Sequence, residues 1–418
     1  MISGIKTLLK GNFISKAIVV LMIPIIARLY TPNEIGVAAL FTSCLLIISP
    51  LLNLRYCLAI PLPRRREVVE LLILVCLIFT FITSFLLAVT FLLSSKSVFT
   101  LFGVGEIYDF RFLLVISCLI VSVYEVFNMW IVRRKKFKNF SNVIIKQSLF
   151  GSVVKICGGI GNGPLGLIFG TIVQNSFGLY SFLSTYIEEK KGSYKLNIQL
   201  LLLIVKYYAN YFYFKLPAHL LYAVSAQMPI IYASKYFGMS DVGYLSLAIS
   251  MVALPIGAIS RSINKVYYSE VSSIGKNKSE EIYNVTIKLV KKLFLLGVLV
   301  SFITFILSPW VFSFILGESW NDSGDYARAL SIGLIFQISA TTVIMVLNVI
   351  NLNAFSFFIH LVRFLVISLS FYISYIQSYS LLDSIYAYSV SISLFYLFVI
   401  ISIILILKKN VLKNGEVK

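Results

Sequence analysis

The stretch "IPIIARLYTPNEIG" at residues 23–36 follows a long apolar run and returns in altered form as "MPIIYASKYFGMSDVG" at residues 228–243. Pro24 recurs as Pro229 and Gly36 as Gly243, at offsets of 205 and 207 residues in a chain of 418. The acidic Glu34 likewise recurs as an aspartate. An offset of half the chain predicts two halves that share one architecture.

The composition is that of a membrane protein. Hydrophobic residues make up 59% of the chain and charged residues 13%, against about 45–50% and about 25% in soluble domains. Apolar runs near 20 residues recur along the chain, and each is long enough to cross about 30 Å of hydrocarbon as a helix. The runs lack the alternation of a transmembrane barrel. We therefore expect an all-α integral membrane protein.

Twelve spans are predicted, and they divide evenly between the halves. Six spans per half keep both halves in the same orientation, so the repeats are parallel and are expected to enclose a central cavity. The predicted organisation is an N-terminal six-helix lobe at 1–190, a cytoplasmic linker at 191–211 and a C-terminal six-helix lobe at 212–418. The spans are 8–30, 36–58, 68–93, 111–132, 141–161, 164–187, 212–235, 242–264, 289–316, 326–350, 354–376 and 381–407.

Loop charge orients these spans. If the N-terminus is cytoplasmic, 23 of the 36 basic residues fall in cytoplasmic loops and tails, and only five fall on the opposite side. This positive-inside bias predicts a multi-pass protein of the bacterial inner membrane with both termini in the cytoplasm. The net charge of +19 is then a topology signal, and no nucleic-acid partner is expected. The five cysteines have no metal-binding spacing, so no metal site is expected.

Eight basic residues remain at or within predicted spans. Each costs about 2.5–3.5 kcal/mol at a helix centre facing lipid, so the deep ones should face a hydrated interior. Two of them, Lys146 and Lys206, lie near cytoplasmic ends and are expected to extend to the headgroups. Lys16 and Lys155 are predicted near mid-depth, because of their distance from the span ends. The full set is Lys16, Arg55, Lys146, Lys155, Lys206, Lys215, Arg261 and Arg363.

Among the acids, Glu125 is the one that falls deep inside a predicted span. A desolvated carboxyl can bind and release a proton near neutral pH, so one hypothesis is coupling to an H⁺ or Na⁺ gradient. The other hypothesis is a structural counter-ion to a nearby lysine. Four prolines inside or at the ends of spans one, seven and eight are candidate kinks or hinges. They are Pro24, Pro217, Pro229 and Pro255.

Several phrases resemble one transporter family. They are "PIIARLYTPNEIGVAALF" at 24–41, "LRYCLAIPLP" at 54–63, "QMPIIYASKYFGMSDVGYLSLA" at 227–248, "LPIGAISRSINKVYYSEV" at 254–271 and "GESWNDSGDYARAL" at 317–330. Together they look like the Wzx-type polysaccharide-biosynthesis flippases, within the superfamily that also holds multidrug exporters and the lipid II flippase. The resemblance implies two six-helix lobes, a cationic cavity and alternating access.

The implied substrate is an undecaprenyl-diphosphate-linked oligosaccharide, such as an O-antigen repeat unit, moved from the cytoplasmic to the periplasmic leaflet. Because a diphosphate carries about two negative charges, cationic side chains must replace its lost hydration. Arg55 and Arg261 are the predicted paired contacts near the cytoplasmic side. Lys16, Lys155 and Lys215 are predicted to line the cavity, with Arg363 as a weaker member.

Other readings stay open at this point. A related exporter could carry another lipid-linked glycan or a small molecule, although an exporter of cationic drugs would need acids in its cavity. A membrane polymerase or ligase is disfavoured, since His219 and His360 are the only histidines and both lie in apolar stretches. A scaffold for glycosyltransferases would explain neither the repeat nor the charges. We expect no enzyme and no cofactor; expected partners are membrane lipid, the lipid-linked glycan, and polymerase and chain-length proteins.

Overall fold

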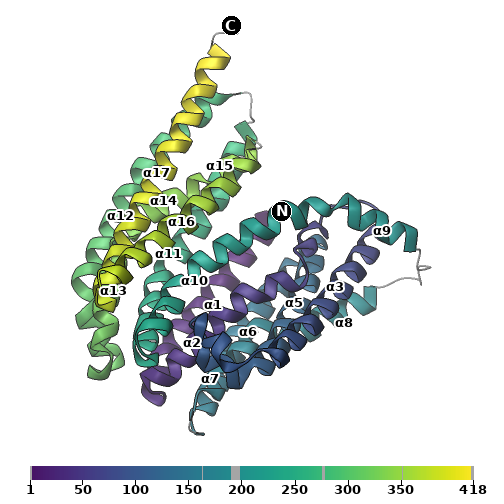
Figure 1. Cartoon of the computed structure of the whole chain (residues 1–418). Helices are drawn as coiled ribbons and strands as arrows, with labels where there is room; N and C mark the ends of the chain where they lie inside the picture. The colour runs from purple at the N-terminus through teal and green to yellow at the C-terminus, as the bar shows by residue number, and fades with distance from the viewer. Residues whose placement is uncertain (1, 162, 190–197, 275–277, 351, 416–418) are drawn as a thin grey trace. The chain divides into compact units, whose positions relative to one another are not determined.

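The computed structural model describes the chain except residues 1, 162, 190–197, 275–277, 351 and 416–418. The described residues form helices and connecting turns, with no strand among them. They pack as two units, Met1–Gly243 and Tyr244–Lys418, and each unit is taken by itself (Figure 1). The predicted lobe boundary at 191–211 lies earlier in the chain than this division and stays a prediction.

The helices of the first unit are α1 (Ile2–Leu29), α2 (Pro32–Leu52), η1 (Tyr56–Ala59), α3 (Arg66–Leu93), α4 (Lys96–Leu101), η2 (Gly105–Phe110), α5 (Arg111–Arg133), α6 (Phe137–Gly158), α7 (Leu165–Ser176), α8 (Leu179–Glu189), α9 (Ile198–Tyr207), the π-helical η3 (Tyr211–Lys215) and α10 (Leu216–Tyr236). The second unit contains most of α11 (Met239–Ile274), then α12 (Ser279–Leu316), η4 (Glu318–Trp320), α13 (Asn321–Ser331), α14 (Leu334–Val343), α15 (Val346–Val349), α16 (Asn353–Ile376) and α17 (Leu381–Gly415).

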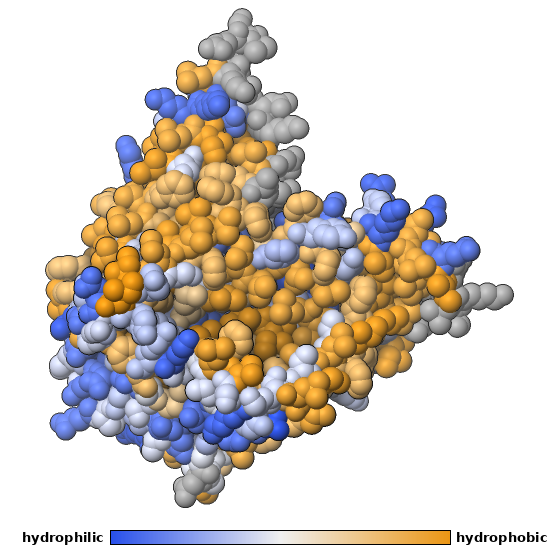
Figure 2. All heavy atoms as spheres, in the orientation of Figure 1, coloured by the Kyte–Doolittle hydropathy of each residue, from blue (hydrophilic) through white to orange (hydrophobic). Residues whose placement is uncertain are grey.

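The helices are those of a multi-pass membrane protein, as predicted. Seven of the described helical stretches are long and apolar enough to cross a bilayer, and helix occupies each of the other five predicted spans. Apolar side chains cover the flanks of the helices, while hydrophilic residues gather at their ends (Figure 2). The seven stretches are Lys10–Leu29, Pro32–Leu52, Arg66–Leu93, Gly105–Arg133, Ser279–Leu316, Phe357–Ile376 and Leu381–Leu412.

Several predicted boundaries are wrong. The span predicted at 36–58 ends as α2 at Leu52, the span at 326–350 is divided among α13, α14 and α15, and α12 begins ten residues earlier than the predicted residue 289. Residues 198–207 of the predicted linker form α9, which packs against α3. Turns and interhelical contacts decide these ends, and hydropathy alone does not report them.

Small residues let the helices of the first unit approach closely. A Cβ atom on Gly11 of α1 would lie 2.0 Å from the Ser141 hydroxyl of α6, and one on Gly158 of α6 would lie 2.4 Å from the Cα of Gly166 at the start of α7. Such contacts replace the hydrophobic driving force that is missing between helices in lipid. Helices α1, α6 and α7 are therefore packed backbone against backbone.

The recurring phrase has a structural counterpart at the start of α2 and α11. Gly36 and Gly243 are each the fifth residue of their helix. A Cβ atom on Gly36 would lie 1.9 Å from the carbonyl oxygen of Met239, and one on Gly243 would lie 1.9 Å from the carbonyl oxygen of Pro32. The contact is reciprocal: the fifth residue of each helix packs on the first residue of the other. Glycine at both repeat positions is required by this approach.

The second unit is built around α12, which packs against α13, α14 and α17, while α16 packs against α17. Here too small residues make the contacts. The hydroxyl of Ser301 donates to the carbonyl of Ser331 at 2.8 Å, and the hydroxyl of Ser308 donates to the carbonyl of Gly324 at 3.1 Å. These bonds cross from α12 to α13 at buried positions and fix the two helices in register.

Candidate functional site

The segment after α2 leaves helical geometry inside the first unit. Leu54 and Arg55 have φ angles of 48° and 62°, a left-handed conformation that costs L-residues roughly 1–2 kcal/mol each. The side chain of Asn53 stabilises the turn by accepting a hydrogen bond from the backbone N–H of Arg55 at 2.9 Å. Strained backbone of this kind occurs where surrounding structure holds a side chain in a required position. Here the positioned side chain is that of Arg55.

Arg55 forms an ion pair with Glu125 of α5. Its Nη1 lies 2.6 Å from Glu125 Oε1, and Asn53 Nδ2 donates to the other carboxylate oxygen at 3.0 Å. The Arg55 side chain is 8% exposed and that of Glu125 is 23% exposed. Glu125 therefore has a counter-ion, as one of the two hypotheses expected, but the partner is an arginine and not the expected lysine.

The cluster of Asn53, Arg55 and Glu125 lies some distance along the helices from their ends. Glu125 is eight residues before the end of α5 at Arg133, which corresponds to about 12 Å along the helix. The residues that follow Arg55 are buried, with Cys57, Ala59 and Ile60 at 0% exposure. Irregular backbone at membrane depth is tolerated only where protein covers it or where it lines a cavity. Water is thus largely excluded from one side of the ion pair, and its electrostatic interaction is strengthened.

Lys155 lies closer to the end of its helix than predicted. It was predicted near mid-span, but α6 runs from Phe137 to Gly158 and Lys155 is in its last turn. The helix begins and ends earlier than the predicted span of 141–161. The ammonium of Lys155 donates to the side chain of Gln174 in α7 at 2.8 Å. The backbone carbonyl of Lys155 accepts a hydrogen bond from the Tyr30 hydroxyl at 2.6 Å. A cation in the last turn also suits the helix dipole.

The other predicted cations are dispersed. Lys16 is half-buried near the middle of α1, and Lys215 is exposed at the end of η3. In the second unit, Arg363 is half-buried on α16, and Arg261 lies on α11 with its side chain outside the described part. The structure brings Arg55 and Glu125 together and leaves a shared cavity of the remaining cations as a prediction.

The prolines leave their helices uninterrupted. Helix α1 continues through Pro24 and α10 continues through Pro229, while Pro217 lies in the first turn of α10, where its missing N–H costs nothing. The π-helical η3 directly precedes this turn. Pro255 lies in α11, but its side chain is outside the described part. A hinge role for these positions stays a prediction.

Sequence reasoning missed three residues that hold the predicted ones in place: Asn53, Gln174 and Tyr30. Asn53 is 0% exposed and contacts both Arg55 and Glu125. The available signal was a pair of polar residues, Asn53 and Arg55, at the end of an otherwise apolar run. Gln174 gave a similar signal as an amide in an apolar span.

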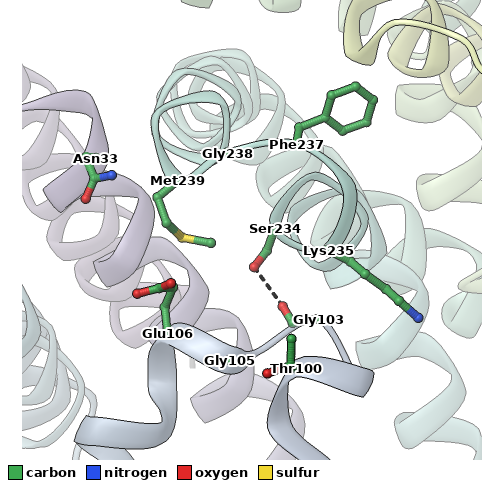
Figure 3. A pocket seen from close by; sticks show the side chains of 10 residues that line it. All are labelled: Asn33, Thr100, Gly103, Gly105, Glu106, Ser234, Lys235, Phe237, Gly238 and Met239. Atoms are coloured by element: carbon green, nitrogen blue, oxygen red, sulfur yellow. Dashed lines mark hydrogen bonds between the residues drawn. The ribbon is translucent and has the colours of Figure 1, made fainter. Parts of the chain in front are cut away.

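A pocket of about 330 Å³ that the sequence did not predict lies beside the start of α2 and the end of α10. Ser234 donates to the carbonyl of Gly103 at 2.7 Å and ties the loop after α4 to α10. Lys235 extends away from Glu106, so the two charged side chains do not converge (Figure 3). No group of three metal-ligating side chains occurs in the described part of the chain. We assign no binding role to this pocket.

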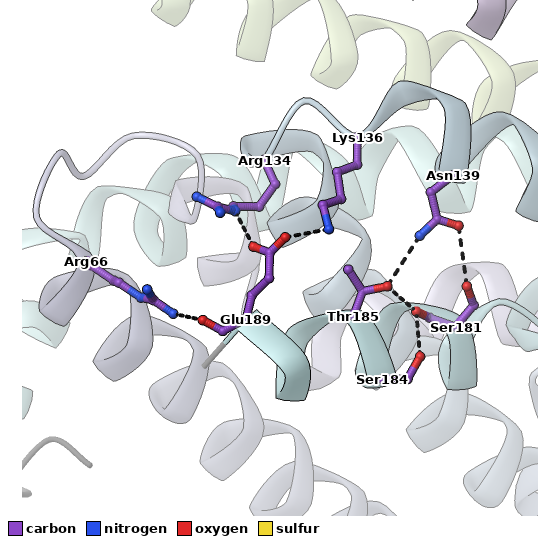
Figure 4. A network of polar contacts seen from close by, with 8 residues as sticks. All are labelled: Arg66, Arg134, Lys136, Asn139, Ser181, Ser184, Thr185 and Glu189. Carbon is purple, nitrogen blue, oxygen red and sulfur yellow. Dashed lines mark hydrogen bonds and ion pairs between the residues drawn. The ribbon is translucent and has the colours of Figure 1, made fainter. Parts of the chain in front are cut away.

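A polar network joins the C-terminal ends of α5 and α8 (Figure 4). Glu189 pairs with Arg134 at 2.6 Å and with Lys136, and its backbone carbonyl accepts from Arg66. Hydrogen bonds from Lys136 and Arg134 hold the pKa of the Glu189 carboxyl below its ordinary value. Residue Lys135 between them has a positive φ of 55°. The network therefore fixes a sharp turn between α5 and α6.

Comparison with solved structures shows the fold. An inward-facing multidrug resistance MATE family transporter of the MOP superfamily superposes with a TM-score of 0.75 at 15% identity, over 96% of each chain. The lipid II flippase MurJ in an inward closed conformation gives a TM-score of 0.73 at 14% identity, over 94% of this chain and 86% of that one. These likenesses show that the chain shares the fold of these membrane proteins.

Comparison with family profiles identifies the family of the chain as well as its fold. A search of curated proteins found no match to this chain. The profile described as "Polysaccharide biosynthesis protein" matches residues 25–325. This match includes the phrases at 24–41, 54–63, 227–248 and 254–271, which carried the resemblance, almost in full. The chain thus belongs to the polysaccharide biosynthesis protein family.

Proposed function

We propose that the protein moves an undecaprenyl-diphosphate-linked oligosaccharide from the cytoplasmic to the periplasmic leaflet of the bacterial inner membrane by alternating access. Membership of the polysaccharide biosynthesis family and a membrane transporter fold support a role in glycan transport. The positive-inside bias supports cytoplasmic termini. O-antigen or a related repeat unit is the proposed glycan.

One observation carries the proposal: a guanidinium held below the helix ends by a strained turn and a carboxylate. The two contacts of Asn53 fix both Arg55 and Glu125. Guanidinium matches phosphate through a planar fork of donors, which an ammonium cannot do. The Nε of Arg55 has no hydrogen-bond partner among the described residues. An arriving diphosphate can therefore exchange with the carboxylate as the partner of Arg55.

This exchange also assigns a role to Glu125. When phosphate binds the guanidinium of Arg55, the carboxylate of Glu125 loses its counter-ion. Glu125 is therefore proposed both as the structural counter-ion of Arg55 and as the coupling site for an H⁺ or Na⁺ gradient. Arg261, Lys16, Lys155, Lys215 and Arg363 are proposed as further contacts along the path of the diphosphate, with Arg261 as the repeat-related partner of Arg55.

The test is flipping by purified protein in reconstituted vesicles loaded with a diphosphate-linked oligosaccharide. We expect Arg55→Gln, Arg261→Gln and the double variant each to slow translocation by tenfold or more. Lys146→Gln is the matched control, because Lys146 is exposed on α6 and has no partner among the described residues. Unchanged translocation by Arg55→Gln at normal protein levels would remove Arg55 from the mechanism.

Coupling is tested separately with Glu125→Gln. We expect this variant to retain substrate binding and to lose the dependence of translocation on an imposed pH gradient. Undiminished transport that still responds to the gradient would end the coupling role of Glu125 and leave it as a structural counter-ion.

A further inference from the structure

A second basic site lies at the surface of the first unit, apart from the Arg55 cluster. A pocket of about 380 Å³ opens between the loop before α3 and the end of α5. We call it the arginine pocket. It is lined by Pro61, Leu62, Pro63, Arg64, Arg133 and Arg134.

The walls of the arginine pocket are held in place by hydrogen bonds. The guanidinium of Arg133 donates to the carbonyls of Pro61 at 3.2 Å and Arg64 at 3.4 Å, so it joins the loop to the end of α5. Arg134 is oriented by its Nε, which donates to Glu189 at 2.6 Å (Figure 4). Two of the three arginines are thus pre-positioned, which lowers the entropy cost of binding an anion.

The charge of the pocket is incompletely balanced. No acidic side chain lines the pocket. Glu189, which pairs with Arg134, also forms an ion pair with Lys136. The guanidinium of Arg64 is exposed and has no partner among the described residues. Planar guanidinium donors can form two parallel hydrogen bonds with the oxygens of a phosphate or a carboxylate. The pocket is therefore suited to a phosphate group.

Its surroundings favour a phosphate that belongs to a lipid. The pocket lies at the start of α3, whose flank exposes large apolar side chains, among them Phe81, Ile82 and Phe85 at 55%, 51% and 69% exposure. Leu62 in the pocket wall is itself 59% exposed. A lipid with its headgroup in the pocket could lay its chains along this flank. By the positive-inside bias, the pocket faces the cytoplasmic leaflet, where anionic lipids attract basic residues.

We propose that the arginine pocket binds the headgroup of an anionic phospholipid of the cytoplasmic leaflet. The site is distinct from the proposed substrate contact at Arg55 and does not depend on it. Each arginine contact is expected to contribute about five-fold in affinity, from the strength of basic residues near an anionic surface.

The experiment is native mass spectrometry of the full-length protein titrated with phosphatidylglycerol, phosphatidylcholine or inorganic phosphate. We expect preferential retention of phosphatidylglycerol, reduced about five-fold by Arg64→Gln and further by Arg64→Gln with Arg134→Gln. Arg65→Gln is the matched control, because Arg65 adjoins the pocket in sequence without lining it. Arg65→Gln should change retention of phosphatidylglycerol by less than two-fold. Retention by Arg134→Lys should be intermediate between that of the wild type and that of Arg134→Gln.

Three outcomes would overturn the proposal. Equal loss in Arg64→Gln and Arg65→Gln would indicate diffuse surface charge, and equal retention of both lipids would exclude headgroup recognition. Binding of inorganic phosphate alone with no preference between lipids would indicate a soluble anion as the ligand. Because no outcome depends on translocation, failure here is distinguishable from failure of the proposed function. Arg64→Gln removes no side-chain hydrogen bond or ion pair among the described residues, so the variant should fold normally.

Discussion

The ion pair between Arg55 and Glu125 predicts a strong coupling in stability. Glu125→Gln removes the charged partner of the Arg55 guanidinium, whose side chain is 8% exposed. Arg55→Gln leaves a carboxylate that still accepts from Asn53 at 3.0 Å. The first substitution should therefore destabilise the protein more than the second, because it strands the more deeply buried charge.

The magnitudes follow from burial. Breaking a buried pair by removing one partner costs about 3–5 kcal/mol, and the 23% exposure of Glu125 favours the lower value. We expect about 3 kcal/mol for Glu125→Gln and about 2 kcal/mol for Arg55→Gln. The double variant replaces both charges by amides that can hydrogen-bond, so it should lose only about 2 kcal/mol. The resulting coupling of about 3 kcal/mol corresponds to roughly a hundred-fold in an equilibrium constant.

The assay is denaturant titration of the purified variants in mild-detergent micelles, analysed as a double-mutant cycle with Lys146→Gln as the control. The decisive quantity is the coupling free energy between the two substitutions. If the double variant loses the sum of the two single losses, the ion pair is absent from the protein and the argument for a held guanidinium is refuted.

Three further predictions use the same titration. Gly36→Ala should destabilise the protein by about 1–3 kcal/mol, because its Cβ would meet a backbone carbonyl at 1.9 Å. The control Gly161→Ala should be nearly neutral, because a Cβ atom there would have nothing within 4 Å. Equal losses of stability in the two variants would contradict the close approach at Gly36. Because the pKa of Glu189 is lowered in the folded protein, its advantage over Glu189→Gln should be present at pH 7 and vanish as the pH falls through that lowered pKa; an advantage independent of pH would disprove the ion pairs. Gln174→Leu should cost about 1–3 kcal/mol by stranding the Lys155 ammonium, and adding Lys155→Met should restore most of it; a stable single variant would show that the bond contributes nothing.

Sequence alone was sufficient for the class of fold. Each span is a local property, since about 20 apolar residues must form a helix wherever they meet hydrocarbon. The recurrence of Pro24 and Gly36 as Pro229 and Gly243 likewise indicated two halves without any coordinates. The unusual polarity of Arg55 and Glu125 also marked them as candidates, because charge inside an apolar span is costly.

Only the tertiary structure decided what these residues contact. Arg55 and Glu125 are 70 positions apart, and their pairing depends on where α2 stops at Leu52 and how it packs on α5. The last-turn position of Lys155 depends in the same way on where α6 begins and ends. Hydropathy measures the cost of placing a segment in lipid, whereas turns, helix rotation and crossing geometry set which polar groups meet. Those quantities depend on contacts between distant segments, and no single span contains them.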